Sequence, residues 1–347
     1  MRTTALFLLL AAAGCGGSAG PTAPATPGPS APTSLAWRWR ALTPAGAVPE
    51  PRAHGAAVFD PVGRRLIVFG GQGELGLLND VWAFDLAAGT WSRLATRGTG
   101  PPERLGADAV YDPGGHRLVL WAGQNGRRFF DDTWTLDLTA LEWRDVSPAA
   151  RPRARYGSAS VFDPLQRRLV QFAGFTDVAR RFRDTQAFAL EGLRWDDLTP
   201  PGGGPAERCL LTAALHEPTR RMIVYGGQSS GFLDDLWSFD LAARAWTDLT
   251  TPDRPPGRLL AGSFVDGDGH FVVFGGRTAA GAVNETWAFD LARGSWSRRD
   301  VPAPPPAREA AMAAAADGGR RFLVFGGRDG ALRNDLWELA LVAVAAR

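Results

Sequence analysis

Residues 52–94 read RAHGAAVFD (52–60), RLIVFGG (65–71), NDVWAFDL (79–86) and WSRL (91–94). Each segment is a short apolar or alternating run bounded by Gly, Pro or Asp. That pattern predicts four consecutive antiparallel strands. A single four-stranded sheet of this length cannot bury both of its faces, so the segment predicts a unit that needs neighbours of the same kind.

The unit recurs to the end of the chain. The glycine that ends the second strand falls at Gly71, Gly123, Gly174, Gly227, Gly276 and Gly327. Successive spacings are 52, 51, 53, 49 and 51 residues. A fixed period of this length is the signature of a repeat architecture, and it predicts six units.

The third strand carries a paired signal, an aromatic residue with an acid two positions before it. The aromatic is Trp82, Trp134, Trp237, Trp287 and Trp337, and Gln186 stands in its place in the third unit. The acids are Asp80, Asp132, Asp184, Asp235, Glu285 and Asp335.

The fourth strand shows how the repeat closes on itself. Its tryptophan appears at Trp91, Trp143, Trp195, Trp246 and Trp296, and the sixth unit has none. Residues 39–42, however, lie 52 residues before the segment 91–94 and share its Trp-x-x-Leu pattern. We therefore expect the strand at 39–42 to be the outer strand of the last unit.

These features resemble kelch repeats, over residues 37–341. The resemblance implies an all-β, six-bladed kelch-type β-propeller with four antiparallel strands per blade, the N-terminal strand completing the last blade. Units two and three depart from the pattern, since they have Ala-Gly where Gly-Gly is usual. Unit three also lacks the third-strand Trp (Gln186) and the acid after it (Ala189), so blade three is expected to pack least well.

The N-terminus predicts export. Arg2 precedes a short apolar run, and residues 12–15 (AAGC) resemble a bacterial lipobox, in which the cysteine accepts the lipid. We expect a signal peptide at 1–14, a lipidated Cys15 with a Pro/Ala/Gly/Ser tether to residue 36, and the propeller at 37–347. The expected location is a bacterial membrane, with the outer membrane favoured. An ordinary secretory signal is the alternative.

One face of the propeller is predicted to carry the candidate site. An arginine precedes each first strand: Arg52, Arg104, Arg155, Arg208, Arg258 and Arg308. On the same face, just past the glycines, come Gln72, Gln124, Phe175, Gln228, Arg277 and Arg328. A ring of Arg and Gln around a channel mouth suits an anionic or carboxylate-bearing ligand. The resemblance also implies such a role, since some kelch domains hold acidic peptides with arginines at this point. The alternative is that the six arginines pair with the third-strand acids and brace the blades.

Two loops on this face interleave aromatic and basic residues, RRFF (127–130) and RRFR (180–183). This composition is typical of interaction surfaces. The alternative is that Phe129 and Phe182 pack beneath their own loops. Trp121, inside a second strand, is expected to be core.

Catalysis has little support in the sequence. The four histidines are scattered over different blades, no set of ligands converges on a metal, and no cofactor is expected. The tyrosine, histidine and cysteine cluster of galactose oxidase has no counterpart here, and Cys209 has no evident histidine partner. An enzymatic alternative is a mutarotase or epimerase acting on an acidic sugar such as sialic acid, with Glu103 or Glu207 as the base.

The prediction is therefore a lipid-anchored binding module for a protein or glycan ligand. The net charge of +2 gives no reason to expect nucleic acid, and we expect a monomer.

Overall fold

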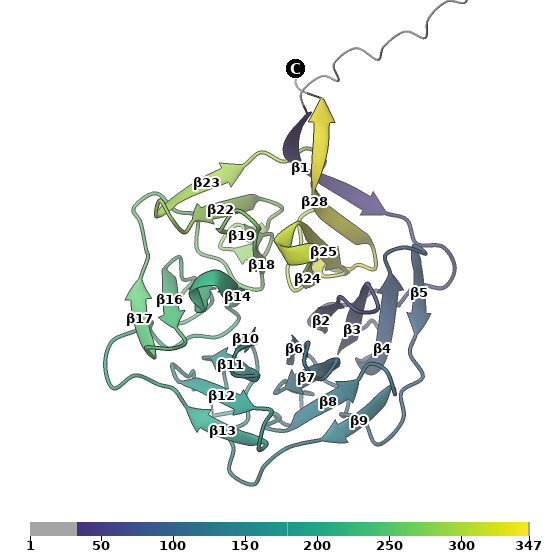
Figure 1. The fold of residues 1–347 in the computed structure, drawn as a ribbon, viewed down its shortest axis with the longest axis vertical. Coiled ribbons are helices and arrows are strands. Elements are labelled where there is room, and N and C mark those ends of the chain that lie inside the picture. Colours follow the sequence, from purple (N-terminus) through teal and green to yellow (C-terminus); the bar gives the residue numbers. More distant parts are fainter. Residues whose placement is uncertain (1–32, 179, 346–347) are drawn as a thin grey trace, which may run out of the picture. The chain divides into compact units, whose positions relative to one another are not determined.

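A computed structural model describes residues 33–178 and 180–345. Residues 35–342 form one compact unit, in which six four-stranded antiparallel sheets surround a central channel (Figure 1). The first strand of each sheet lies nearest the channel and the fourth lies at the rim. The predicted six-bladed propeller is confirmed.

Each blade follows the order predicted from the repeat. The first three sheets are β2 (Ala56–Asp60), β3 (Arg65–Gln72), β4 (Leu77–Asp85), β5 (Thr90–Arg93); β6 (Asp108–Asp112), β7 (Arg117–Trp121), β8 (Thr133–Asp137), β9 (Glu142–Asp145); and β10 (Ala159–Asp163), β11 (Arg168–Phe172), β12 (Thr185–Ala189), β13 (Arg194–Asp197). The fourth and fifth are β14 (Thr212–His216), β15 (Arg221–Tyr225), β16 (Leu236–Asp240), β17 (Ala245–Asp248); and β18 (Gly262–Val265), β19 (His270–Phe274), β22 (Thr286–Asp290), β23 (Ser295–Arg299).

The sixth sheet joins the two ends of the chain. Its order is β24 (Met312–Ala316), β25 (Arg321–Phe325), β28 (Leu336–Ala345) and β1 (Thr33–Leu42). The segment at 39–42 is thus the outer strand of the last blade, as predicted. The strand begins at Thr33, four residues before the expected boundary at 37.

Short elements complete the loops. The hairpin strands are β20 (Arg277–Thr278), β21 (Gly281–Ala282), β26 (Arg328–Asp329) and β27 (Ala331–Leu332), and the 3₁₀ turns are η1 (Glu217–Thr219) and η2 (Asp317–Gly319).

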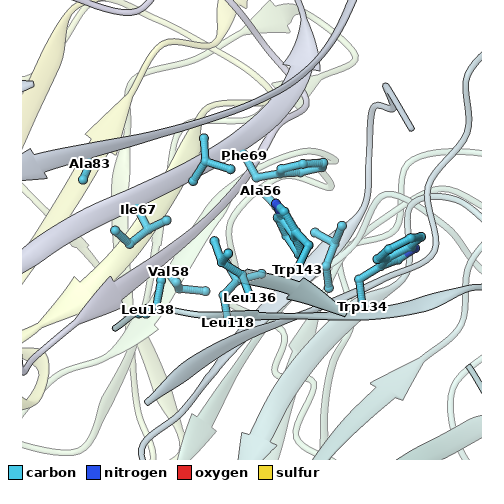
Figure 2. Packing of buried hydrophobic residues seen from close by; sticks show 12 residues of the cluster. Ala56, Val58, Ile67, Phe69, Ala83, Leu118, Trp134, Leu136, Leu138 and Trp143 are labelled. Atoms are coloured by element: carbon cyan, nitrogen blue, oxygen red, sulfur yellow. The ribbon is translucent and has the colours of Figure 1, made fainter. Parts of the chain in front are cut away.

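The core is divided into six hydrophobic clusters, one in each gap between neighbouring blades. Figure 2 shows the cluster between blades one and two, where Val58 and Phe69 of the first blade meet Leu136 and Trp143 of the second. Apolar burial between blades is therefore what makes the ring cohere.

The fourth-strand tryptophans pack each blade against the one before it. Each lies against the aromatic residue that ends the preceding blade's second strand, with ring centroids 4.3–5.5 Å apart. The pairs are Trp91–Phe325, Trp143–Phe69, Trp195–Trp121, Trp246–Phe172, Trp296–Tyr225 and Trp39–Phe274. Tilted and edge-on aromatic contacts of this kind stabilise the joint beyond the effect of the apolar area that they bury. Trp121 is core, as expected.

The two Ala-Gly departures have a conformational explanation. Ala122 and Ala173 adopt φ values of 63° and 68°, inside the left-handed region that an alanine tolerates at modest cost. The glycine that follows has φ between 88° and 113° in all six blades, and a Cβ at Gly71 would lie 2.6 Å from the Ala53 carbonyl oxygen. The backbone conformation therefore requires glycine at the second position, whereas blades two and three accommodate an alanine at the first.

Blade three has a polar residue where the other blades are apolar. Gln171 of β11 is fully buried, and neither its amide nitrogen nor its amide oxygen has a hydrogen-bond partner among the described residues. Its cross-strand neighbour is Gln186, whereas the matching pair in blade one is Val68 and Trp82. An unpartnered buried amide is destabilising, which gives the expected weakness of blade three a specific cause.

We predict that Gln171→Val stabilises the protein by about 1–2 kcal/mol, because it removes the unpartnered amide and restores the residue of blade one. The measurement is the urea midpoint followed by tryptophan fluorescence. Ile223→Val, at a buried site without a polar defect, is the control and should lower the midpoint. A lower midpoint for Gln171→Val would show that the amide has a partner in solution.

Candidate functional site: the channel mouth

The six arginines that precede the first strands do not face a ligand. Their side chains are only 0–1% exposed. In five blades both terminal nitrogens donate to the two carboxylate oxygens of the third-strand aspartate at 2.6–3.0 Å. In blade five Arg258 makes a single bond to Glu285, at 3.0 Å. The geometry favours the bracing alternative.

Each guanidinium is satisfied further by the backbone. In each blade one terminal nitrogen also donates to the carbonyl oxygen of the residue before the second glycine, at 2.9–3.3 Å, as Arg104 does to Ala122. The Nε donates to a carbonyl two residues upstream, as Arg104 does to Pro102. Because these side chains are buried and each is paired with an acid, the geometry favours a structural role for Arg52, Arg104, Arg155, Arg208, Arg258 and Arg308, and their role as ligand contacts is not supported.

The acid of each brace also explains the acid-x-Trp pattern. The Trp indole nitrogen donates to the same carboxylate at 2.7–3.0 Å in five blades. In blade three Gln186 donates its amide to Asp184 at 3.3 Å, so it replaces the indole as a donor. Burial alone would raise the pKa of Asp132, but the hydrogen bonds and charge of Arg104, with Trp134, hold it below its ordinary value.

We predict that Arg104→Ala destabilises the fold by about 3–5 kcal/mol, because it leaves Asp132 without its countercharge in a largely buried site. Arg293, which is 82% exposed, provides the control, and Arg293→Ala should change stability by less than about 0.5 kcal/mol. The measurement is urea unfolding. Equal midpoints for the two variants would return Arg104 to the list of candidate ligand contacts.

The residues of the second predicted ring lie beside the residues that follow the braces. Gln72, Gln124, Phe175, Gln228, Arg277 and Arg328 each form an antiparallel bridge with the residue that follows the bracing arginine: Ala53, Leu105, Tyr156, Cys209, Leu259 and Glu309. These twelve positions vary from blade to blade, unlike the braces. They give the mouth an uneven chemical surface, and their role in ligand binding stays a prediction.

Blades five and six make the mouth charged. Glu309 is 3% exposed, and one of its carboxylate oxygens accepts from Arg328 at 3.0 Å and from Arg277 at 3.4 Å. The side chains of Arg277 and Arg328 are 50% and 39% exposed. Because each guanidinium has five N–H donors, both arginines keep donors that face solvent.

The mouth narrows at a ring of residues that lie two positions after each brace. All six have φ between 53° and 65°: His54, Gly106, Gly157, Leu210, Leu260 and Ala310. Five backbone hydrogen bonds of 2.6–3.0 Å link neighbours in this ring. The sixth bond, from Gly157 to Gly106, is not formed among the described residues. At that point the ring of Tyr156 packs against Gly106.

The aromatic loops divide into a buried and an exposed part. Phe130 and Phe182 lie against the bracing guanidiniums of Arg104 and Arg155, at 3.9 and 4.1 Å. Phe129 contacts Phe175 of the next blade, with ring centroids 5.9 Å apart. Phe182 therefore packs beneath its loop, as the alternative predicted.

The arginines of these two loops remain available. Arg127 and Arg180 are exposed, and neither has a side-chain partner among the described residues. Blades two and three thus add positive, aromatic-backed surface beside the mouth, which suits contact with a partner protein.

The predicted catalytic candidates do not form a site. Glu103 and Glu207 are exposed and have no hydrogen bonds within the part of the chain that the structure describes. Cys209 is buried, and its thiol donates weakly to the Gln228 carbonyl oxygen. Burial raises the pKa of that thiol, which opposes use as a nucleophile. The geometry gives no support to a mutarotase.

One side-chain group could be mistaken for a metal site. Asp266, Asp268 and His270 lie close together in the turn between β18 and β19. Oδ1 of Asp266, however, already accepts the backbone N–H groups of Asp268 and His270, at 3.0 and 2.9 Å. The cluster is an Asp-capped turn, so it carries no metal assignment.

The fold and the mouth define the class of the protein: a β-propeller with Arg–acid braces and a mouth face that varies from blade to blade. Its family is now identifiable, because the KLHDC2/KLHL20/DRC7 Kelch-repeats domain matches residues 33–218 and 166–344. The chain belongs to the kelch-repeat family.

Individual proteins are also similar to this chain, as two examples show. The chain is 28% identical over 264 residues to host cell factor homolog hcf-1 of Caenorhabditis elegans, covering 69% of this chain and 33% of that protein. It is 31% identical over 266 residues to Adagio-like protein 1 of Oryza sativa subsp. japonica, covering 69% and 41%. The aligned part thus spans well under half of these relatives, so their activities cannot be transferred from the match alone.

The predicted anchor lies outside the described residues, as do the signal peptide at 1–14, Cys15 and most of the tether. Among the residues that the structure describes, no helix is long and apolar enough to cross a membrane.

Proposed function

We propose that this chain is a protein-binding module whose binding surface is the channel-mouth face. Kelch propellers generally bind proteins, and the fold of this chain is a kelch propeller. The observation that carries the choice of face is the contrast between its two sets of arginines. The six braces are buried and paired with acids, whereas Arg127, Arg180, Arg277 and Arg328 are partly or fully exposed around one opening.

The exposed arginines indicate which kind of partner segment this face would bind. Arginine offers paired donors to carboxylates, and the aromatic rings behind the loops provide apolar area beside them. The rim would therefore contact an acidic segment of the partner protein. An arginine at the rim of an interface acts chiefly on the rate of association, so binding should weaken as salt is raised.

We predict that Arg127→Glu with Arg180→Glu abolishes capture of the partner by the whole chain, because it reverses the loop charge. The measurement is quantitative capture from the host envelope, with the wild type competing. Arg244→Glu with Arg293→Glu is the matched control, since these exposed arginines lie in third-to-fourth-strand turns on the opposite face. If both double variants lose or both keep the same captured protein, the assigned face is wrong.

We propose further that the module is exported and held to the outer membrane by a lipid on Cys15. The support is the sequence Ala12-Ala13-Gly14-Cys15 at the end of an apolar run that follows Arg2. The propeller would then act outside the cytoplasm, on envelope proteins.

We predict that Cys15→Ser moves the protein from the membrane fraction to the soluble fraction of the host, because one acyl site is removed while the propeller is unchanged. Immunoblotting of the two fractions measures this. Cys209→Ser is the control for loss of a thiol elsewhere. An unchanged membrane fraction for Cys15→Ser would reject the anchor and leave the binding face unaffected.

A further inference from the structure

The channel mouth opens into a cavity of about 180 Å³ with two unlike halves. Blades four to six contribute apolar wall, including Leu210 and Leu260. Blades one to three contribute the polar side chains, which are His54, Asp108, Tyr156 and Ser158. A small cavity with apolar walls and a few convergent polar groups is the usual form of a specific binding site.

Asp108 supplies the only carboxylate of this cavity. One of its oxygens accepts the hydroxyls of Ser158 and Ser160, at 2.6 and 2.9 Å. The other oxygen has no partner among the described residues. Burial raises the pKa of Asp108 to about 6 against the opposing effect of the serines, so the group is ionised at pH 7.

The equivalent position at another joint between blades shows that the fold does not require a carboxylate here. Between blades four and five, Thr212 occupies the place of Asp108 and Ser263 that of Ser160, and their two hydroxyls are hydrogen-bonded. A neutral pair therefore joins two blades at the same point. Burying a carboxylate there instead costs free energy, and a costly charge in a cavity points to recognition.

The neighbouring arginines are each paired with an acid other than Asp108. Arg155 is bound to Asp184, and the guanidinium of Arg328 is bound to Glu309, as is that of Arg277. Burial first, and the charge of Arg328 second, lower the pKa of His54 to about 4. His54 is thus neutral at pH 7, and its Nδ1 is buried without a partner.

We infer that this cavity holds an alkylammonium group, supplied by a lysine side chain of the bound protein. The free oxygen of Asp108 accepts from the ammonium, while Leu210 and Leu260 cover the alkyl chain. The inference deepens the proposed protein-binding role and rests on its choice of face. The partner segment then carries a central lysine between acidic residues, which matches a negative cavity inside a positive rim.

The test uses n-butylammonium as the probe, with n-butanol and butyrate as neutral and anionic analogues of similar size. Binding to the whole chain is measured by calorimetry at pH 7.5. We expect n-butylammonium to bind at least tenfold more tightly than either analogue. Asp108→Asn, which keeps an acceptor for the serines, should remove that preference, whereas Glu103→Gln at an exposed mouth-face site should keep it.

A second measurement needs no variant. Protonation of Asp108 should weaken n-butylammonium binding at least fivefold between pH 7.5 and pH 5, with n-butanol unchanged. His54 stays neutral over this range, and burial raises the pKa of Tyr156 to about 12, so neither contributes. The nearby arginines remain charged.

Equal affinity for the three probes, or an unchanged preference in Asp108→Asn, would overturn the inference. Absence of the n-butylammonium preference in the wild type, with its capture of the partner intact, would separate the two proposals. In that case the cavity is structural and the binding face stands. If the wild type prefers n-butylammonium but the Arg127→Glu, Arg180→Glu variant still captures the partner, the cavity inference stands and the role of the loop arginines is rejected.

Discussion

The buried pair between a bracing arginine and a third-strand acid is the interaction on which the propeller depends. The arginine side chain binds the third strand and the second-strand carbonyl of its own blade. Its backbone carbonyl accepts the N–H of the glycine in the preceding blade, as Arg104 does from Gly71 at 3.0 Å. One residue therefore fixes both the inside of a blade and the joint between two blades, and this explains why it recurs in every unit.

That arrangement separates structural from functional chemistry at the mouth. A residue that meets the same internal partner six times is already satisfied, and its charge is cancelled by the acid beside it. The proposed ligand contacts fall instead at positions that differ between blades, such as Asp108. In a repeat protein the departures from the pattern are thus better guides to a ligand than the pattern itself.

Sequence reasoning could reach the fold but only part of the site. The spacing of the glycines and the two tryptophan stripes predicted six blades, and the isolated Trp39 segment predicted how the ring closes. The direction of the arginine side chains could not be read from their recurrence, because a loop before a strand has no side-chain alternation to assign its inner and outer faces. The signal for bracing was nevertheless present, since each arginine is matched by an acid 27–29 residues later.

Asp108 had no comparable signal. It is the first residue of a first strand, where other blades have Ala56, Thr212 or Met312, and a single acid in that place reads as a turn residue. Its importance depends on the two serines of the next blade and on the cavity at the mouth, which are contacts between units rather than properties of one unit.

Several departures from the repeat occur at one joint, between blades two and three. Asp108 binds Ser160 there, and Ser160 is the cross-strand neighbour of the unpartnered Gln171. At the same joint the backbone ring is open and Tyr156 packs against Gly106. Each of these features lowers stability when considered alone, because each replaces an apolar or hydrogen-bonded contact of the repeat. Their concentration beside the cavity is consistent with the proposed binding site, and it makes this joint the place where ligand binding and propeller stability should be most strongly coupled.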